Sequence, residues 1–194
     1  MEKRACRIYL FRHGQTFYNK NKIFTGWKDS KLTPIGIMQA RVIARKLKGK
    51  KIDAAYTSDL SRCKDTLKEV LAYHRECKKT IVDKRLRERS YGKLEGTSHK
   101  EFIKKYGIEK FNIYHRSYDV APPSGESIKM VEKRVRAFIK ELLKYVRKNK
   151  VDVAVSASGN SMRPFRRYFE KASVEKMMKW EMPWDDYFEY SVKI

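Results

Sequence analysis

Three polar stretches of this chain carry side chains that could act together on a phosphate ester. Arg12, His13 and Gly14 follow one apolar run. Glu88 lies between two arginines after another such run, and Ser158 follows a third. An imidazole can attack phosphorus and hold the phosphoryl group covalently, while arginine neutralises the phosphoryl oxygens. A carboxyl group can protonate the leaving oxygen and deprotonate the incoming one, so these residue types point to phosphoryl transfer.

The runs before these residues are typical of buried strands, because they are apolar and rich in β-branched or aromatic residues. They are Cys6 to Phe11, Ile52 to Thr57, Ile81 to Leu86 and Val151 to Ser156. Parallel strands deliver the residues that follow them to one edge of a sheet, where open α/β folds bind ligands. We therefore expect the segments around His13, Glu88 and Ser158 to meet at that edge.

Helical patterns separate these strands. Thr33 and Pro34 form a helix start, with Thr33 as the N-cap, and apolar residues then recur at helical spacing up to Gly49. Further helices are expected over residues 59–73, 98–106, 127–148 and 174–180, with another that Arg163 opens and that holds Pro164 in its first turn. A last strand, over residues 187–194, is expected at an edge of the sheet.

The alternation of strands and helices predicts one α/β domain over residues 1–194, a three-layer α/β/α sandwich with a mostly parallel central sheet. Residues 17–27 read as a loop, and residues 107–126 read as an irregular segment rich in Pro and Gly. A long irregular segment inside a compact domain is often functional, so we expect residues 107–126 to form a lid over a site.

Arg62 lies in the first turn of the helix expected to begin near residue 59. The backbone N–H groups and the helix dipole already favour an anion there, so a cation is unfavourable for the helix itself. We therefore assign Arg62 to a ligand. Cys63, the next residue, is expected to be a packing residue rather than a nucleophile.

Charge favours anionic partners. The 194 residues include 46 Lys and Arg against 23 Asp and Glu, a net charge of +23. Phosphorylated metabolites, nucleic acid and acidic surfaces all suit this excess. The charge is spread along the chain without a basic tail, so nucleic acid is the less favoured partner, and the lysine content also fits a thermophile.

Three cysteines without metal-ligand spacing predict a reduced, cytoplasmic protein with no metal. There is no signal-peptide pattern and no apolar run of about 18 residues, so we expect neither secretion nor a membrane partner.

The segment Leu10 to Thr16, Leu-Phe-Arg-His-Gly-Gln-Thr, resembles the signature of the histidine phosphatase superfamily, whose fold is that of the phosphoglycerate mutases. Further matching segments follow in the family's order and extend the resemblance over nearly the whole chain. They are Thr25 to Asp29, Leu32-Thr33, Thr57 to Arg62 and Leu86 to Gly92.

Two later segments resemble the lid and the Gly-Glu-Ser motif of the cofactor-dependent phosphoglycerate mutases: Arg116 to Pro123, and Pro123 to Ser127. This resemblance implies interconversion of 3-phosphoglycerate and 2-phosphoglycerate, in glycolysis and gluconeogenesis, with 2,3-bisphosphoglycerate as the phosphoryl primer. It implies that His13 is the phosphorylated nucleophile and Glu88 the proton donor and acceptor. The residues implied to bind phosphate or substrate are Arg12, Asn19, Thr25, Gly26, Arg62, Tyr91, Lys100, Arg116, Gly159 and Asn160.

Three departures leave a broad-specificity histidine phosphatase open. His115 stands where the mutases carry an arginine, and His99 stands where they carry a lysine, with Lys100 adjacent and able to reach. The chain is also shorter than typical bacterial and animal mutases.

The largest departure is Ser158, which stands where the family has its second catalytic histidine. A serine is shorter, neutral and a poor base, so we expect a crippled enzyme. The serine is interpreted either as an introduced substitution or as a natural variant of weak or altered activity. A non-catalytic protein that binds anions or nucleic acid on the same fold is the remaining alternative, and a homodimer is left open.

Overall fold

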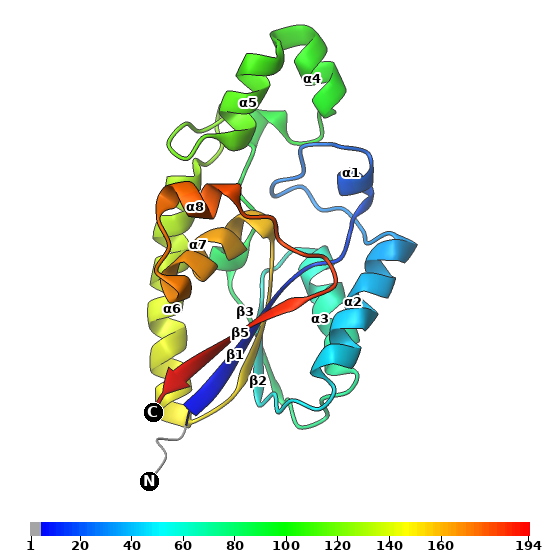
Figure 1. Cartoon of the computed structure of the whole chain (residues 1–194). Coiled ribbons are helices and arrows are strands. Elements are labelled where there is room, and N and C mark those ends of the chain that lie inside the picture. The colour runs from blue at the N-terminus through cyan, green and yellow to red at the C-terminus, as the bar shows by residue number, and fades with distance from the viewer. Residues whose placement is uncertain (1–4) are drawn as a thin grey trace.

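A computed structural model describes residues 5–194, in which a five-stranded sheet lies between two groups of helices (Figure 1). The strands lie in the order β3-β2-β4-β1-β5, and only β5 is antiparallel to its neighbour. This confirms the mostly parallel sheet and places the last strand at an edge. The strands are β1 (Ala5–Arg12), β2 (Ala54–Thr57), β3 (Lys79–Val82), β4 (Val153–Ala157) and β5 (Tyr187–Lys193).

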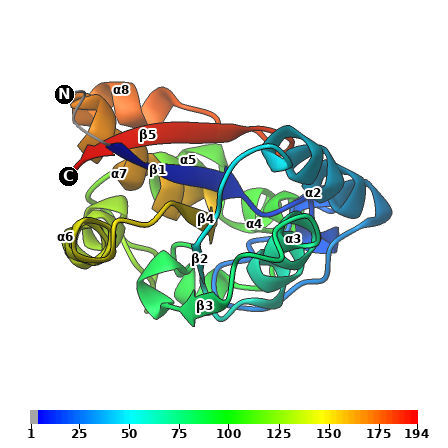
Figure 2. The ribbon, with the colours of Figure 1, turned by 90° about the horizontal axis from the view of Figure 1, so that it is seen from below.

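Helices cover both faces of the sheet, which confirms the three-layer architecture (Figure 2). Helices α6 (Ile128–Asn149) and α7 (Gly159–Glu170) lie on one face, and α8 (Val174–Lys179) packs on α7. Helices α2 (Pro34–Leu47) and α3 (Ser61–Leu71) lie on the other.

Alternate residues of β1 face the two layers, as the pleat of a strand requires. Ile8 and Leu10 pack with the α6 and α7 side chains, whereas Tyr9 and Phe11 pack with those of α2 and α3. Each large apolar side chain buried in this way contributes about 1.5–3 kcal/mol.

The register of the sheet brings the ends of three strands together. Arg12 on β1 is level with Ala157 on β4, and Thr57 on β2 is level with Ser156. The residues that follow these strands therefore emerge at one edge. The His13 N–H donates to the carbonyl oxygen of Ala157 (3.0 Å), which extends the pairing by one residue into the turn.

A separate group of elements lies beyond this edge of the sheet (Figure 1). It contains α1 (Phe17–Lys20), α4 (His99–Tyr106) and α5 (Ile108–Arg116). Phe24 forms the centre of an aromatic cluster here, with Tyr91, Phe102 and Phe111 packed around it. We call α4, α5 and the loop that follows them to residue 126 the lid.

The structure corrects two expectations near Glu88. The strand expected over Ile81 to Leu86 ends at Val82, and Lys84–Leu86 forms a 3-10 turn. The Asp83 carboxylate accepts from the Arg85 N–H (2.9 Å) and pairs with the Arg85 guanidinium, which closes the turn locally. Glu88 therefore reaches the sheet edge on a loop rather than on a strand end.

Helices also replace expected loops. Residues 17–20 form the short helix α1, which a capping box between Thr16 and Asn19 starts. Residues 108–116, expected to be irregular, form α5, because its aromatic side chains pack on the Phe24 cluster. Helix α7 begins at Gly159 rather than at Arg163, so Pro164 lies inside it and not in its first turn.

No helix within residues 5–194 is both long and apolar enough to cross a membrane.

Candidate active site

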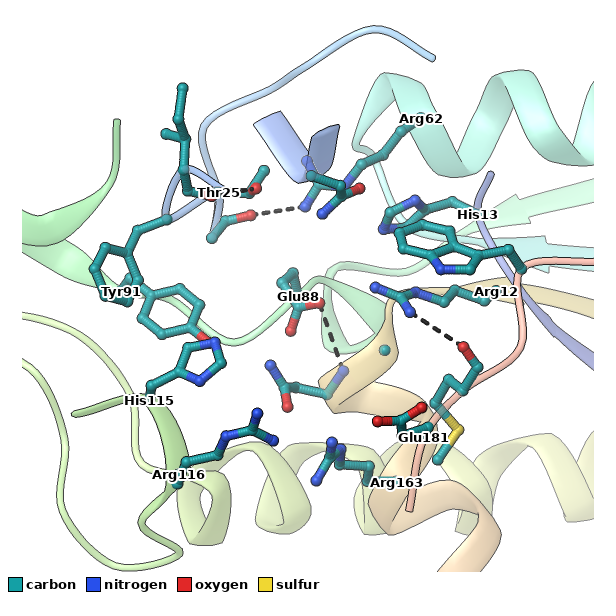
Figure 3. A pocket seen from close by; sticks show the side chains of 18 of the residues that line it. Arg12, His13, Thr25, Arg62, Glu88, Tyr91, His115, Arg116, Arg163 and Glu181 are labelled. Atoms are coloured by element: carbon teal, nitrogen blue, oxygen red, sulfur yellow. Dashed lines mark hydrogen bonds between the residues drawn. The ribbon is translucent and has the colours of Figure 1, made fainter. Parts of the chain in front are cut away.

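A cavity of about 550 Å³ lies between the sheet edge and the lid (Figure 3). Most of the residues chosen from the sequence line it, although they come from segments far apart in the chain. They are Arg12, His13, Asn19, Thr25, Gly26, Arg62, Glu88, Tyr91, Arg116, Gly159 and Asn160. Ser158 and Lys100 do not line it.

His13 directly follows β1 and is buried, with 2% of its surface exposed. Its Nδ1 lies 2.8 Å from the carbonyl oxygen of Gly14. A carbonyl oxygen can only accept, so Nδ1 carries the proton and Nε2 keeps its lone pair. Burial, and then the charges of Arg62 and Arg12, hold the pKa of His13 well below its usual range. The imidazole is therefore neutral at pH 7 and has a nucleophilic Nε2.

Gly14 fixes the turn after His13 by close packing. A Cβ at Gly14 would lie 2.1 Å from the carbonyl oxygen of Gly36 on α2, so no other residue fits. The Gly14 N–H donates to the Thr66 hydroxyl on α3 (3.0 Å). The turn that orients His13 is thus tied to both helices of one layer.

Arg12 keeps one edge of its guanidinium free. Its Nη1 donates to the carbonyl oxygen of Met182 (3.1 Å), whereas its buried Nε–H has no acceptor within residues 5–194. A Cβ on Gly159 would lie 3.4 Å from Nε, in ordinary van der Waals contact, so the backbone at the start of α7 lies beside this edge. Burial lowers the pKa of Arg12 to about 10, so the group stays charged at neutral pH. A free Nε–Nη2 edge is the fork that binds phosphate oxygens.

Arg62 lies on the other side of His13 (Figure 3). The side chain is 1% exposed, and its two terminal nitrogens donate to the carbonyl oxygens of Gly26 (2.7 Å) and Lys28 (3.1 Å). Its Nε–H, like that of Arg12, is buried without an acceptor in the described part of the chain. Two buried donors without acceptors in one cavity call for an anion, because an unmet buried donor costs ~1–3 kcal/mol.

Asn19 has the orientation of its amide set by α1. Its Oδ1 accepts from the Thr16 N–H (3.1 Å) and from the Thr16 hydroxyl (2.9 Å). The Nδ2 amino group is therefore left as a donor toward the cavity that Asn19 lines. Thr25 and Gly26 follow on the adjoining loop, where Gly26 adopts a positive φ of 55°.

Glu88 is 9% exposed and lies opposite the start of α7. Its Oε1 accepts from the backbone N–H of Arg89 (2.7 Å), and its Oε2 lies 3.5 Å from the backbone nitrogen of Asn160. The second oxygen thus has only a long contact and remains available to exchange a proton in the cavity.

Ser158 is fully buried and does not line the cavity. Its hydroxyl oxygen lies 3.6 Å from the Cys63 sulfur, beneath the turn that starts α7. Burial raises the pKa of Cys63, which is inaccessible to solvent, so the sulfur packs as a neutral thiol. The Ser158 hydroxyl therefore does not reach a phosphoryl group beside His13.

The lid side of the cavity is lined by the imidazoles of His99 and His115, whereas the sequence analysis predicted Lys100 there. Lys100 is exposed, and His99 lines the cavity instead, which corrects the expectation for Lys100. His115 stacks on Phe111 (4.9 Å between centroids) and lies parallel to Tyr91 (6.3 Å). Burial, the largest cause, lowers the pKa of His115 to about 3 and also lowers the pKa of His99, so both rings are neutral at pH 7.

A second group of donors lies at the lid end of the cavity. Arg116 at the end of α5 and Arg163 on α7 project toward the same space in Figure 3, and Asn160 also lines the cavity. Arg163 is anchored by a bond from Nη1 to the carbonyl oxygen of Met178 (2.6 Å). The cavity thus has two clusters of cationic side chains. Arg12 and Arg62 lie beside His13, and Arg116 and Arg163 lie at the lid end.

Several positioning residues escaped the sequence analysis. The Glu95 carboxylate accepts from the backbone N–H groups of Trp27, Lys28 and Tyr91, which joins two loops of the cavity wall. Arg134 on α6 donates to the carbonyl oxygen of Glu88 (3.0 Å) and so fixes the loop that carries it. No motif marks either residue, because many of their partners are backbone atoms, several of them remote in sequence.

Comparison with known proteins agrees with this geometry. Residues 8–192 match the family described as the histidine phosphatase superfamily (branch 1). This chain belongs to the histidine phosphatase superfamily. The superfamily is one of enzymes, and the mostly parallel α/β sandwich agrees with membership in it.

The curated relatives carry mutase names. The 2,3-bisphosphoglycerate-dependent phosphoglycerate mutase of Parvibaculum lavamentivorans is 39% identical over 175 residues, which are 88% of this chain and 83% of that protein. The phosphoglycerate mutase of Schizosaccharomyces pombe is 37% identical over 179 residues, 90% of this chain and 84% of that protein.

A solved structure with a phosphatase name is also similar. The mycobacterial glucosyl-3-phosphoglycerate phosphatase is 25% identical, with a TM-score of 0.81 over 97% of this chain and 91% of its own. Within residues 5–194 no group of three or more His, Cys, Asp or Glu side chains could hold a metal ion.

Proposed function

We propose that this chain transfers phosphoryl groups through His13 and interconverts 3-phosphoglycerate and 2-phosphoglycerate, with 2,3-bisphosphoglycerate as primer. The observation that carries the proposal is the state of His13. It is neutral, its Nδ1–H is bonded to Gly14, and the unmet Nε–H donors of Arg12 and Arg62 flank it. The names of the curated relatives support the choice of substrate.

The first half of the reaction uses the sheet-edge residues. Nε2 of His13 attacks phosphorus, and the bond from phosphorus to the substrate oxygen breaks. Arg12, Arg62 and the Asn19 amide stabilise the charge on the phosphoryl oxygens. Glu88 gives its proton to the leaving oxygen.

The second half reverses these roles on another hydroxyl. Glu88 takes the proton of the incoming hydroxyl, whose oxygen then attacks phosphorus and releases His13. Transfer to the other hydroxyl of the same glycerate skeleton gives a mutase, whereas transfer to water gives a phosphatase. The site must therefore hold the acceptor while His13 is phosphorylated.

The cavity fits a primer with two phosphoryl groups. One group would be held by the unmet Nε–H donors of Arg12 and Arg62, and the other by Arg116, Arg163 and the Asn160 amide. When bound, 2,3-bisphosphoglycerate supplies the phosphoryl group that His13 carries.

Ser158 weakens this site in our proposal. Its hydroxyl is buried against Cys63, so the subsite lacks a second group that would stabilise charge. Loss of one such group costs ~10²–10⁴-fold in rate. We propose that the chain binds phosphorylated ligands and turns them over slowly.

The test compares this chain with Ser158→His and, as a control of similar size without a basic nitrogen, Ser158→Asn. Isomerisation of 3-phosphoglycerate would be measured with and without 2,3-bisphosphoglycerate, and phosphate release would be followed in the same samples. We expect Ser158→His to isomerise at least ~100-fold faster than the parent, only with the bisphosphate, because an imidazole restores the missing group. Equal rates in all three proteins would contradict the proposal.

A phosphatase is the second candidate, favoured by the neutral His99 and His115 at the lid. Neutral rings attract a second anionic group less than cations would. Phosphate release without isomerisation would select this candidate. Binding of nucleic acid with steep salt dependence, and no phosphorylation of His13, would select a non-catalytic anion-binding protein. A cytoplasmic location, a thermophilic source, a homodimer and a single domain over residues 1–194 stay predictions.

A further inference from the structure

Trp184 lies in the loop between α8 and β5 and lines the cavity beside His13. Its ring covers one face of the Arg12 guanidinium, whose central carbon lies 3.5 Å from the ring centroid. The Trp184 and His13 rings form a T-shaped pair with a centroid distance of 5.9 Å and an interplanar angle of 68°. Trp184 therefore touches both residues proposed to act on the phosphoryl group.

The same loop also fixes the rotation of the guanidinium. The Met182 carbonyl oxygen accepts from Nη1 of Arg12 (3.1 Å), two residues before Trp184. The ring sets the plane of the guanidinium, and the carbonyl sets its rotation within that plane. The Nε–Nη2 edge is then the part left for a ligand, and it lies against the bare backbone of Gly159.

Arg12 is charged in a buried place beside two other cations. Burial is the largest cause of its lowered pKa; the nearby Glu88 charge raises this pKa, whereas Arg163 and Arg62 lower it. Arg12 forms no ion pair with any residue from 5 to 194. An aromatic face stabilises a cation without neutralising it, whereas a carboxylate would compete with a phosphate for the same donors.

The other two tryptophans provide a contrast. Trp180 lies over Arg166 (4.1 Å) and Trp27 lies over Arg87 (4.9 Å). Those arginines are also paired with carboxylates, Arg166 with Glu170 and Arg87 with Asp59. Of these three Trp–Arg stacks in the described chain, only the one with Trp184 involves an arginine that has no carboxylate partner. The charge of Arg12 is therefore available to a ligand.

We propose that Trp184 is a positioning residue, which holds the Arg12 guanidinium in the plane that presents its Nε–Nη2 edge to the phosphoryl group. The inference rests on the proposed phosphoryl transfer at His13. It extends that function to a residue that no sequence motif marked.

The test measures the affinity for inorganic phosphate by calorimetry. Trp184→Leu keeps an apolar side chain but removes the aromatic face, and Trp184→Phe keeps an aromatic face. We expect Trp184→Leu to bind phosphate about 3- to 30-fold more weakly than the parent, from the usual strength of a desolvated cation–π contact. Trp184→Phe should stay within about threefold of the parent, since a phenyl face also attracts the guanidinium.

Trp180→Leu is the matched control, because it removes a Trp–Arg stack from the same loop outside the cavity. It should leave phosphate affinity unchanged while lowering the melting temperature. In the Ser158→His background, Trp184→Leu should raise KM and lower kcat, since Arg12 acts in both the bound and the transition state.

Two results would overturn the inference: parental phosphate affinity in Trp184→Leu, or equal losses in Trp184→Leu and Trp184→Phe. Phosphate binding needs no turnover, so the test remains valid if the mutase proposal fails. Conversely, an active mutase with unchanged phosphate affinity in Trp184→Leu would refute only the role of Trp184.

Discussion

The cavity has two halves that are built in different ways. At the sheet edge, Arg12 ends the inner strand β1 and His13 follows it, and the pairing of β1 with β4 fixes their place. Under the lid, His99 and His115 come from α4 and α5, and stacked rings hold them. The first half depends on backbone hydrogen bonds of the sheet, and the second depends on side-chain packing.

The halves also differ in charge. The sheet-edge half carries buried arginines with unmet donors, whereas the lid half carries neutral imidazoles and the exposed Arg116. A rigid, charged half suits the bond-breaking step, which is similar for every phosphate ester. The lid half, which side-chain packing holds in place, suits recognition of the part of the substrate that does not react. We therefore propose that the reaction takes place at the sheet edge and that the lid contributes to the choice of substrate.

The largest effect should come from His13. We expect His13→Asn to lower turnover by ~10⁴-fold or more and to abolish the phosphoenzyme, because the amide cannot act as the nucleophile. Rapid-quench assays with a labelled phosphate donor would measure both quantities. His115→Asn is the control from the lid half and should keep the phosphoenzyme. A labelled phosphoenzyme in His13→Asn would contradict the proposal that the reaction takes place at the sheet edge.

A smaller effect should come from Arg116 in the lid half, and it should depend on which substrate is used. We expect Arg116→Ala to raise KM for 3-phosphoglycerate by ~10- to 100-fold, the usual worth of a hydrogen bond to a charged group. Phenyl phosphate has no second anionic group, so its hydrolysis should be unchanged. Arg41→Ala removes a surface arginine paired with Glu69 and serves as the control. Equal losses on both substrates would mean that the lid also takes part in the chemistry.

The smallest effect concerns stability and pH. His115 has a lowered pKa, so the folded chain keeps it neutral while the unfolded chain protonates it below about pH 6.5. The folded state therefore loses stability as the pH falls below that value. His115→Phe keeps the stacking with Phe111 and removes a buried Nδ1 that has no partner in the described chain.

We expect His115→Phe to be more stable than the parent by about 1 kcal/mol near pH 5.5, with the gain shrinking toward pH 8. Urea unfolding at both pH values would measure it. A gain that is the same at both pH values would show that packing, not protonation, is responsible.

The sheet-edge half could be predicted from the sequence. Parallel strands place the residues that follow them at one edge, so an apolar run ending in Arg12 and His13 predicted the position of the proposed nucleophile. The unfavourable position of Arg62 in a helix start located a second cation. Both arguments use local sequence and a rule of topology, and the register of β1, β2 and β4 agrees with them.

The lid half, and the positions of Glu88 and Trp184 at the sheet edge, could not be predicted in the same way. Helix α5 depends on the packing of Phe111 against Phe24, which is remote in sequence. The path of Glu88 depends on a turn closed by Asp83 and Arg85. Trp184 meets Arg12 only because β5 pairs with β1, and neither side chain signals that contact in the sequence.

The central claim is that the sheet edge makes Nε2 of His13 the nucleophile. The most direct test mixes the chain with 2,3-bisphosphoglycerate, quenches it in base and locates the phosphoryl group by peptide mass spectrometry and ³¹P NMR. We predict an acid-labile phosphoryl group on Nε2 of His13, because Nδ1 is bonded to the Gly14 carbonyl oxygen. A phosphoryl group on Nδ1 or on another residue, or none at all, would contradict the account.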